Sequence, residues 1–224
     1  MPTIPLFTAA ELQDLPGVIS APRFATYLQA RGNDVADALA LYQWNLELSA
    51  AFMVPLQVCE IAARNGVAEA IEKVHGPDWP WSTGFVRSLP VPRTRTHYNP
   101  QIDLRAVAAR EPTTGRVVAE LKFAFWEKVF TVGQDARLWL PHFRTSFPGV
   151  PAATSIPIAR AAAFTALQHV RHFRNRIAHH EPIFARNTAA DYALIHEVIG
   201  WRSPTGAAWM NNIQRVTALI QVKP

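Results

Sequence analysis

The sequence has a single cysteine, Cys59, so no disulfide can form within the chain. Residues 1–5, MPTIP, lack the basic start and the apolar run of a secretory signal. The longest central stretch without a charge, residues 48–59, is much shorter than the roughly 20 apolar residues of a membrane-spanning helix, and it contains Pro55. These absences predict a cytoplasmic protein with no membrane partner.

Signatures of several enzyme classes are also missing. No G-x-S-x-G sequence, phosphate-binding loop or dinucleotide-binding fingerprint occurs. His179 and His180 are adjacent and would point about 100° apart on a helix, whereas two histidines that chelate one metal ion from a helix stand four positions apart. His75 and Asp78 are only a partial match elsewhere. We therefore expect neither a bound metal ion nor a cofactor.

Acidic residues are absent between Asp135 and Glu181. The basic side chains and histidines in this window are Arg137, His142, Arg144, Arg160, His169, Arg171, His172, Arg174, Arg176, His179 and His180. A segment with one sign of charge favours a polyanion, and the phosphates of RNA or DNA are the obvious candidates. A solvated basic face is the simpler alternative.

The chain is long enough for one sizeable core, because 49% of its 224 residues are apolar. We interpret residues 1–224 as a single domain. Apolar residues recur at intervals of three and four, and neither an alternating strand pattern nor an internal repeat is present. The pattern predicts an all-α helical bundle.

Several helix boundaries follow from local signals. Thr8 and Glu11 have the spacing of a capping box, and Thr113 is a weaker start because Arg116 stands where the acid would be. Ser20 is another good start. Helical patterns cover residues 34–75, 102–109, 117–130, 135–143, 158–180, 188–200 and 204–221.

Prolines modify this pattern at two places. Pro55 is expected to kink or divide the helix over residues 34–75. Residues 76–100 contain five prolines together with Trp79 and Trp81, and prolines at this density exclude a regular helix or a central strand. We expect a long ordered Pro/Trp-rich loop inserted into the bundle.

The segment 158–180 carries a row of polar side chains. Its apolar side, which must face the core, consists of Ala163, Leu167, Val170, Phe173 and Ile177. Arg171, Asn175 and His179 lie opposite, four positions apart, so they share one row on consecutive turns. Such a row could hold a phosphate, because it combines a fork of donors, a neutral amide and a group that titrates near neutral pH.

Arg174 stands at the edge of the apolar stripe, where an unpaired charge would be costly. One interpretation is a salt bridge to an acidic residue of a neighbouring helix, with Glu60 a candidate. The other is that this edge faces a second protomer or a cleft in which the arginine meets a ligand phosphate. The sequence leaves both open.

The string from Arg174 to Phe184, RNRIAHHEPIF, resembles the signature of the Abi-like (abortive infection) proteins of the HEPN superfamily. Other segments that look like that family occur in the same order: Trp44-Asn45 with CEIAARN at 59–65, GPDW at 76–79 and VAELKFAFW at 118–126. The resemblance covers about residues 34–201. Ala124 stands where the family often has glycine.

This resemblance implies an all-helical HEPN fold, a homodimer with a shared cleft, and a metal-independent endoribonuclease that acts on RNA in phage defence or as a toxin. An antitoxin would then be a further partner. Carried over residue by residue, Arg174 would stabilise charge on the phosphate, His179 would be the general acid or base, and Asn175 would orient one of them or the RNA.

Further residues are expected to support the site or bind RNA. Glu60, Arg64 and Asn65 match the family's second recurrent element, as catalytic groups or as braces for the motif helix. Arg171, Arg176 and His180 complete this supporting set. The general chemistry fits, because attack by the ribose 2′-hydroxyl needs a base and a donor to the developing charge, and DNA lacks that hydroxyl.

One geometric difficulty arises, since five helical positions place Arg174 and His179 about 140° apart. The helix could loosen before Pro182, the long arginine could curl round, or a symmetric partner could complete the site; we favour the last two together. A catalytically inactive RNA-binding or sensor module of a defence system is the alternative function. A purely structural helical protein is the third.

Overall fold

The computed structural model describes residues 7–94 and 96–224, and every regular element in these ranges is helical, which confirms the all-α class. The α-helices are α1 (Ala9–Ile19), α2 (Ala21–Ala30), α3 (Val35–His75), α4 (Thr83–Ser88), α5 (Pro100–Ala108), α6 (Thr114–Glu120), α7 (Phe123–Val129), α8 (Leu140–Ser146), α9 (Ile156–Ala178), α10 (Thr188–Arg202), α11 (Pro204–Ile213) and α12 (Val216–Gln221). Two short 3-10 helices are η1 (Trp79–Trp81) and η2 (Val132–Gln134), and η3 (Asp135–Trp139) is a short π-helix.

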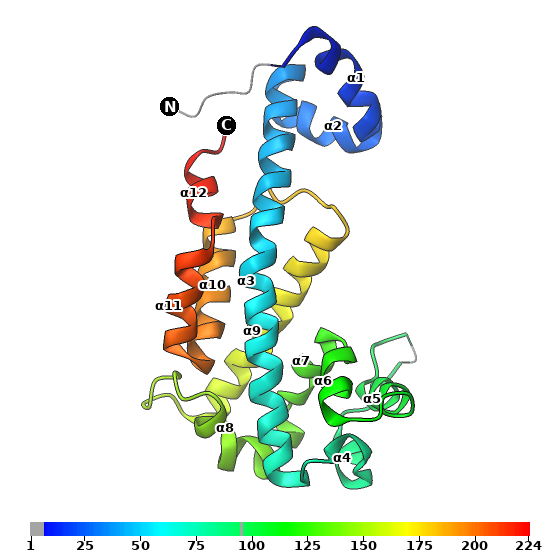
Figure 1. Ribbon diagram of the computed structural model, residues 1–224, viewed down its shortest axis with the longest axis vertical. Helices are drawn as coiled ribbons and strands as arrows, with labels where there is room; N and C mark the ends of the chain where they lie inside the picture. Colours follow the sequence, from blue (N-terminus) through cyan, green and yellow to red (C-terminus); the bar gives the residue numbers. More distant parts are fainter. Residues whose placement is uncertain (1–6, 95) are drawn as a thin grey trace.

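Helix α3 forms the axis of the molecule, and α1, α2, α7, α8, α9, α10 and α12 pack against it along its length (Figure 1). Asp34 caps its start by accepting a hydrogen bond from the Asp37 amide at 2.8 Å. Pro55 is buried inside the helix, which runs uninterrupted over 41 residues, so the expected division does not occur. Phe52 and Leu56 are buried beside the proline, and their packing offsets its cost of about 3 kcal/mol.

The same helix also meets a compositional criterion for crossing a membrane. An 18-residue window of α3 has a mean hydropathy of 1.4, and 33% of that window is buried inside the fold. One helix of this kind is weak evidence for a span, because the core helix of a globular protein passes the same test.

The proline-rich segment is more regular than the sequence predicts. Pro80 is the second residue of η1. Helix α4 lies between Pro80 and Pro90 and contains no proline. Ser82 caps α4 by accepting a hydrogen bond from the Phe85 amide. Trp79 is fully buried against aromatic side chains of α4 and α7. The prolines therefore delimit a short helix, and the tryptophan anchors it to the core.

Residues 117–130 form two helices where the pattern suggests one. Thr113 caps α6 by accepting from the Arg116 amide at 3.4 Å, so it works as a cap without an acid three residues on. The chain is extended at Leu121 and Lys122, and α7 begins directly afterwards. Of the seven residues of α7, five are buried, whereas α6 buries only Val117. The break allows α7 to pack into the core in a different direction from α6.

Helix α9 slants across α3, and the connection from α9 to α10 then crosses α3 (Figure 1). The helix starts at Ile156 and ends at Ala178, two residues before the expected end, with His179 as its C-cap. His180 adopts a left-handed φ of 56°. Helices α10 and α11 lie side by side along α3, and the expected helix over 204–221 is divided into α11 and α12.

Candidate functional site

The arginines of the acid-free segment differ sharply in what they contact. Arg144 donates to four backbone carbonyls of the loop before α9. Arg160 pairs with Asp135 at 3.0 Å. Arg171 donates from Nε to Oε2 of Glu127 at 2.6 Å. These three guanidinium groups stabilise the fold, so half of the six arginines in the segment bond to the protein itself.

Arg176 also has a structural role. Its Nε donates to the carbonyl of Pro182 at 2.8 Å, and its Nη1 lies 3.2 Å from Oε2 of Glu181. The arginine therefore holds the turn that follows α9 against the helix end. Its charge is partly compensated there, which makes it a brace for the motif segment.

Arg174 is different, because its side chain is exposed and forms no ion pair with any carboxylate in the described part of the chain. Its one hydrogen bond runs from Nη1 to Oδ1 of Asn175 at 3.3 Å. The salt bridge to Glu60, one of the two interpretations left open by the sequence, is not formed. Instead the two residues line a hollow of about 400 Å³ between α3 and α9, together with Arg64.

The hollow beside Arg174 combines charged and apolar walls. Helix α3 supplies most of its lining, including Met53, Ile61 and Arg64. Met53 is 48% exposed and Ile61 38% exposed, so apolar side chains face solvent next to the arginines. Such a surface can accept an anion and an apolar partner at the same place.

His179 and His180 lie at the end of the helix and are both exposed. The His179 amide still donates to the Asn175 carbonyl at 2.9 Å, so this residue keeps its helical register. The His180 amide bonds to Ile177, and the His180 carbonyl accepts from Nη1 of Arg23 on α2 at 3.4 Å. Neither imidazole has a hydrogen-bond partner among the described residues, so both can meet a ligand.

The structure separates Asn65 from Glu60 and Arg64, the other predicted residues of α3. Asn65 is exposed on another side of α3 and lines a hollow with Glu69, Glu72 and Asp78. Three carboxylates there give a negative surface, which is unsuitable for a phosphate. Glu60 and Arg64 share the hollow with Arg174, but Asn65 does not.

Asn45 is a supporting residue that the sequence analysis did not assign to the site, although it lies in a segment quoted for the resemblance. It is buried, and its Oδ1 accepts from the amides of Ile183 and Phe184 at 2.8 and 3.1 Å. One side chain of α3 thereby fixes the backbone that follows the motif. A buried asparagine in an apolar helix is the signal that could have found it.

Replacing Asn45 by alanine is expected to lower the free energy of unfolding by about 2–4 kcal/mol, because two buried amides lose their acceptor. Gln43→Ala on the same helix is the matched control; Gln43 is exposed and bonds only to Glu47, so its change should stay within about 0.5 kcal/mol. Urea unfolding followed by circular dichroism measures both. Equal effects would contradict the anchoring role of Asn45.

Other features bear on cofactors and reactive groups. No group of three or more His, Cys, Asp or Glu side chains within residues 7–94 and 96–224 is arranged to hold a metal ion. Burial raises the pKa of the Cys59 thiol, which is fully buried, so this cysteine stays protonated and inert. Neither observation adds a group to the site.

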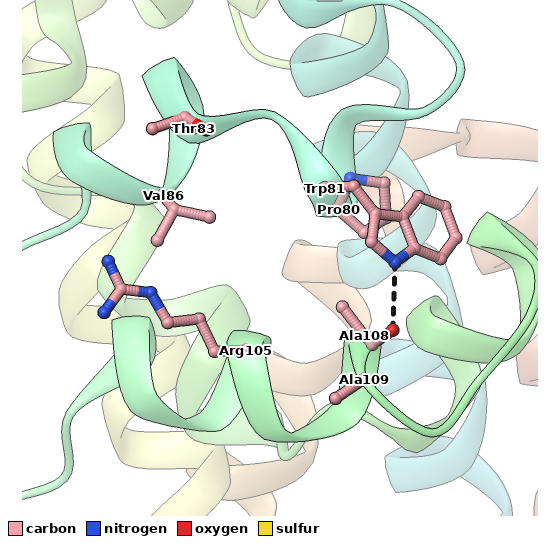
Figure 2. Close-up of a pocket in the computed structure, with 7 residues that line it drawn as sticks. All are labelled: Pro80, Trp81, Thr83, Val86, Arg105, Ala108 and Ala109. Carbon is pink, nitrogen blue, oxygen red and sulfur yellow. Dashed lines mark hydrogen bonds between the residues drawn. The ribbon is translucent and has the colours of Figure 1, made fainter.

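Figure 2 shows a separate hollow of about 290 Å³ between η1, α4 and α5. Trp81 lies at its edge and donates from Nε1 to the Ala108 carbonyl at 2.9 Å. Arg105 is the one charged residue of its lining. None of the predicted site residues reaches this hollow.

No protein-family profile, curated protein or solved structure matches this chain. The resemblance to Abi-like proteins therefore rests on the residues quoted for it.

Proposed function

We propose that the chain is a metal-independent, HEPN-type endoribonuclease that acts in the cytoplasm, in phage defence by abortive infection or as a toxin. Arg174, Asn175 and His179 are its catalytic residues. The observation that carries the proposal is the contrast among the arginines of α9: the other three bond to carboxylates or carbonyls of the fold, whereas Arg174 is exposed beside a hollow and has no carboxylate partner among the described residues. A cation without a carboxylate partner suits a phosphate ligand.

The proposed reaction uses only groups of the chain and the RNA. The ribose 2′-oxygen forms a bond to the adjacent phosphorus, and the bond from phosphorus to the 5′-oxygen of the next nucleotide breaks. His179 accepts the proton of the 2′-hydroxyl, solvent supplies the proton taken by the 5′-oxygen, and Arg174 neutralises the charge on the non-bridging oxygens. The products are a 2′,3′-cyclic phosphate and a 5′-hydroxyl, and DNA is not a substrate.

The active species in this proposal is a homodimer. Arg174 and His179 are about 140° apart on α9, and His179 keeps its helical register, so one helix does not present both groups to one phosphate. The exposed Met53 and Ile61 beside Arg174 offer an apolar contact for a second copy. A twofold arrangement lets the arginine of one chain serve the histidine of the other.

A catalytically inactive RNA-binding or sensor module is the second candidate, and the absence of any hydrogen bond between the described Arg174 and His179 side chains favours it. Incubating purified protein with total RNA in excess EDTA separates the two. Cleavage that persists in EDTA and leaves cyclic phosphate ends supports the nuclease. Intact RNA that is still bound in a salt-dependent manner supports the module, and no binding at all contradicts both.

A further inference from the structure

A second and larger hollow, of about 790 Å³, lies between the proline-rich segment and helices α7 and α9. Its walls include Arg93, His97 and Tyr98 from the segment before α5, Lys128 from α7, and Phe164 and Arg171 from α9. Among the described residues of its lining there is no carboxylate, whereas Arg93, Lys128 and Arg171 are cations. A cavity with one sign of charge attracts an anion and concentrates it.

Two of the cations are held in place by a buried acid. Glu127 is fully buried and accepts from Lys128 Nζ at 2.8 Å through one oxygen and from Arg171 Nε at 2.6 Å through the other. One negative charge thus orients two positive charges, so these three groups carry a net charge of +1, to which Arg93 adds at the cavity wall. Preorganised cations of this kind bind a phosphate at little cost in side-chain entropy.

The remaining lining suits the rest of a nucleotide. Tyr98 and Phe164 are half-buried, and several prolines of the segment complete an apolar wall. Tyr98 donates its hydroxyl to Asp103 at 2.6 Å; burial, more than this hydrogen bond, raises its pKa, so the ring remains a neutral phenol. Neutral aromatic and proline surfaces accept a ribose or a base without sequence readout.

The hollow lies on the helix face that leads to the motif. Phe164 and Arg171 share a face of α9 with Asn175, and Arg171 precedes His179 by eight residues, or about 12 Å along the helix axis. A single RNA strand can span that distance. The exposed His179 imidazole and the cationic hollow are therefore close enough for one RNA strand to contact both.

We propose that this hollow binds a nucleotide phosphate of the RNA substrate, one that flanks the cleaved bond, with Lys128 and Arg171 as the clamp. The inference rests on the proposed function, because it takes RNA as the substrate. The same chemistry would also recognise the phosphate of a free nucleotide, and the binding experiment separates these two sources.

The test measures binding and cleavage separately. Binding uses a labelled 2′-O-methyl RNA 12-mer, which has no free 2′-hydroxyl to attack, and fluorescence anisotropy in EDTA at several salt concentrations. Lys128→Gln keeps a donor to Glu127 and removes the charge. It should weaken binding about tenfold and lower the magnitude of the salt slope by about 1. Arg93→Gln, at an exposed position, should also weaken binding and lower the magnitude of the salt slope, and it leaves the bonds of Glu127 to Lys128 and Arg171 intact.

Arg215→Gln is the matched control, because Arg215 is exposed, pairs with no carboxylate among the described residues and does not line the hollow. Equal weakening by Arg215→Gln would reduce the effect to general charge and overturn the proposal. In cleavage assays with unmodified RNA, Lys128→Gln should raise KM about tenfold and change kcat less than about threefold. A merely structural role would instead lower the melting temperature and leave the salt slope unchanged.

Adenosine monophosphate as a competitor distinguishes the sources. A strand-binding site predicts that the mononucleotide competes at least about a hundredfold less well than the 12-mer, since it offers one phosphate. Equal affinity would assign the hollow to a free nucleotide and overturn its place beside the cleaved bond. If the parent protein does not cleave RNA but the Lys128-dependent binding holds, the nuclease proposal fails and the hollow stands. If the parent protein cleaves RNA but Lys128→Gln binds it unchanged, the nuclease proposal stands and the proposal for the hollow fails.

Discussion

Replacing Arg174 or His179 by alanine is expected to lower the rate of RNA cleavage at least about a hundredfold, because an acid–base group and a charge-stabilising donor each contribute that much. Both side chains are exposed, so the fold should persist and the melting temperature should change by less than about 2 °C. Initial rates on a labelled single-stranded RNA in EDTA and thermal melting by circular dichroism measure the two effects. Asn175→Ala should lower the rate of RNA cleavage less, by about tenfold.

His180→Asn is the control for the histidine assignment. His180 is as exposed as its neighbour, but its backbone has a φ of 56°, a conformation that asparagine tolerates and alanine does not. The substitution therefore removes the imidazole while the turn is kept, and a smaller loss of activity than for His179→Ala is expected. Equal loss with His179→Ala would leave the acid–base role open between the two histidines. Unfolding of Arg174→Ala would instead give Arg174 a structural role.

Mixing two inactive variants is expected to restore cleavage. In a one-to-one mixture of Arg174→Ala and His179→Ala chains, about half of the dimers contain one of each, and each of these has one intact composite site of two, so about a quarter of the parent activity should return. The physical reason is the separation of the two groups on α9, which a partner's helix removes. Cleavage rates after equilibration of the mixture measure this.

The dimer contact has its own control. Met53→Glu places a charge on the exposed apolar edge of the Arg174 hollow and should give a monomer by light scattering, with cleavage reduced at least about tenfold. Val18→Glu makes a similar change at a side chain that is 79% exposed on α1, and it should leave both unchanged. Raising the salt concentration should strengthen association of the parent, because the paired basic surfaces repel each other. A fully active monomer would contradict the composite site.

Local periodicity and capping determined much of the fold from the sequence. The helical period, the capping box at Thr8 and the helix start after Ser20 predict elements that the structure contains, although Ser20 forms no side-chain capping hydrogen bond, and the absence of strand patterns predicts the all-α class. These signals act between residues no more than four apart, so they can be read from the chain itself. The position of the motif on one long helix was predictable for the same reason.

Tertiary packing determines whether a helix is continuous or broken, which local sequence signals do not specify. Pro55 stays within α3 because buried neighbours on both sides offset the lost hydrogen bond, and residues 117–130 are broken because α7 is buried on several faces. No property of residues 117–130 alone distinguishes a straight helix from a broken one. The difference lies in the surrounding core, which the sequence pattern does not describe.

The candidate site shows the same division. The resemblance suggests Arg174, Asn175 and His179 as catalytic residues and Arg171 and Arg176 as supporting ones, but the sequence does not say which of these arginines pairs with an acid. Glu127 pairs with Arg171 across 44 positions, and Asn45 holds the backbone after the motif across 138 positions. Which arginine is neutralised depends on which acid the fold brings beside it. Only the tertiary structure decides that, because an ion pair between helices depends on distance in space and not on spacing in the chain.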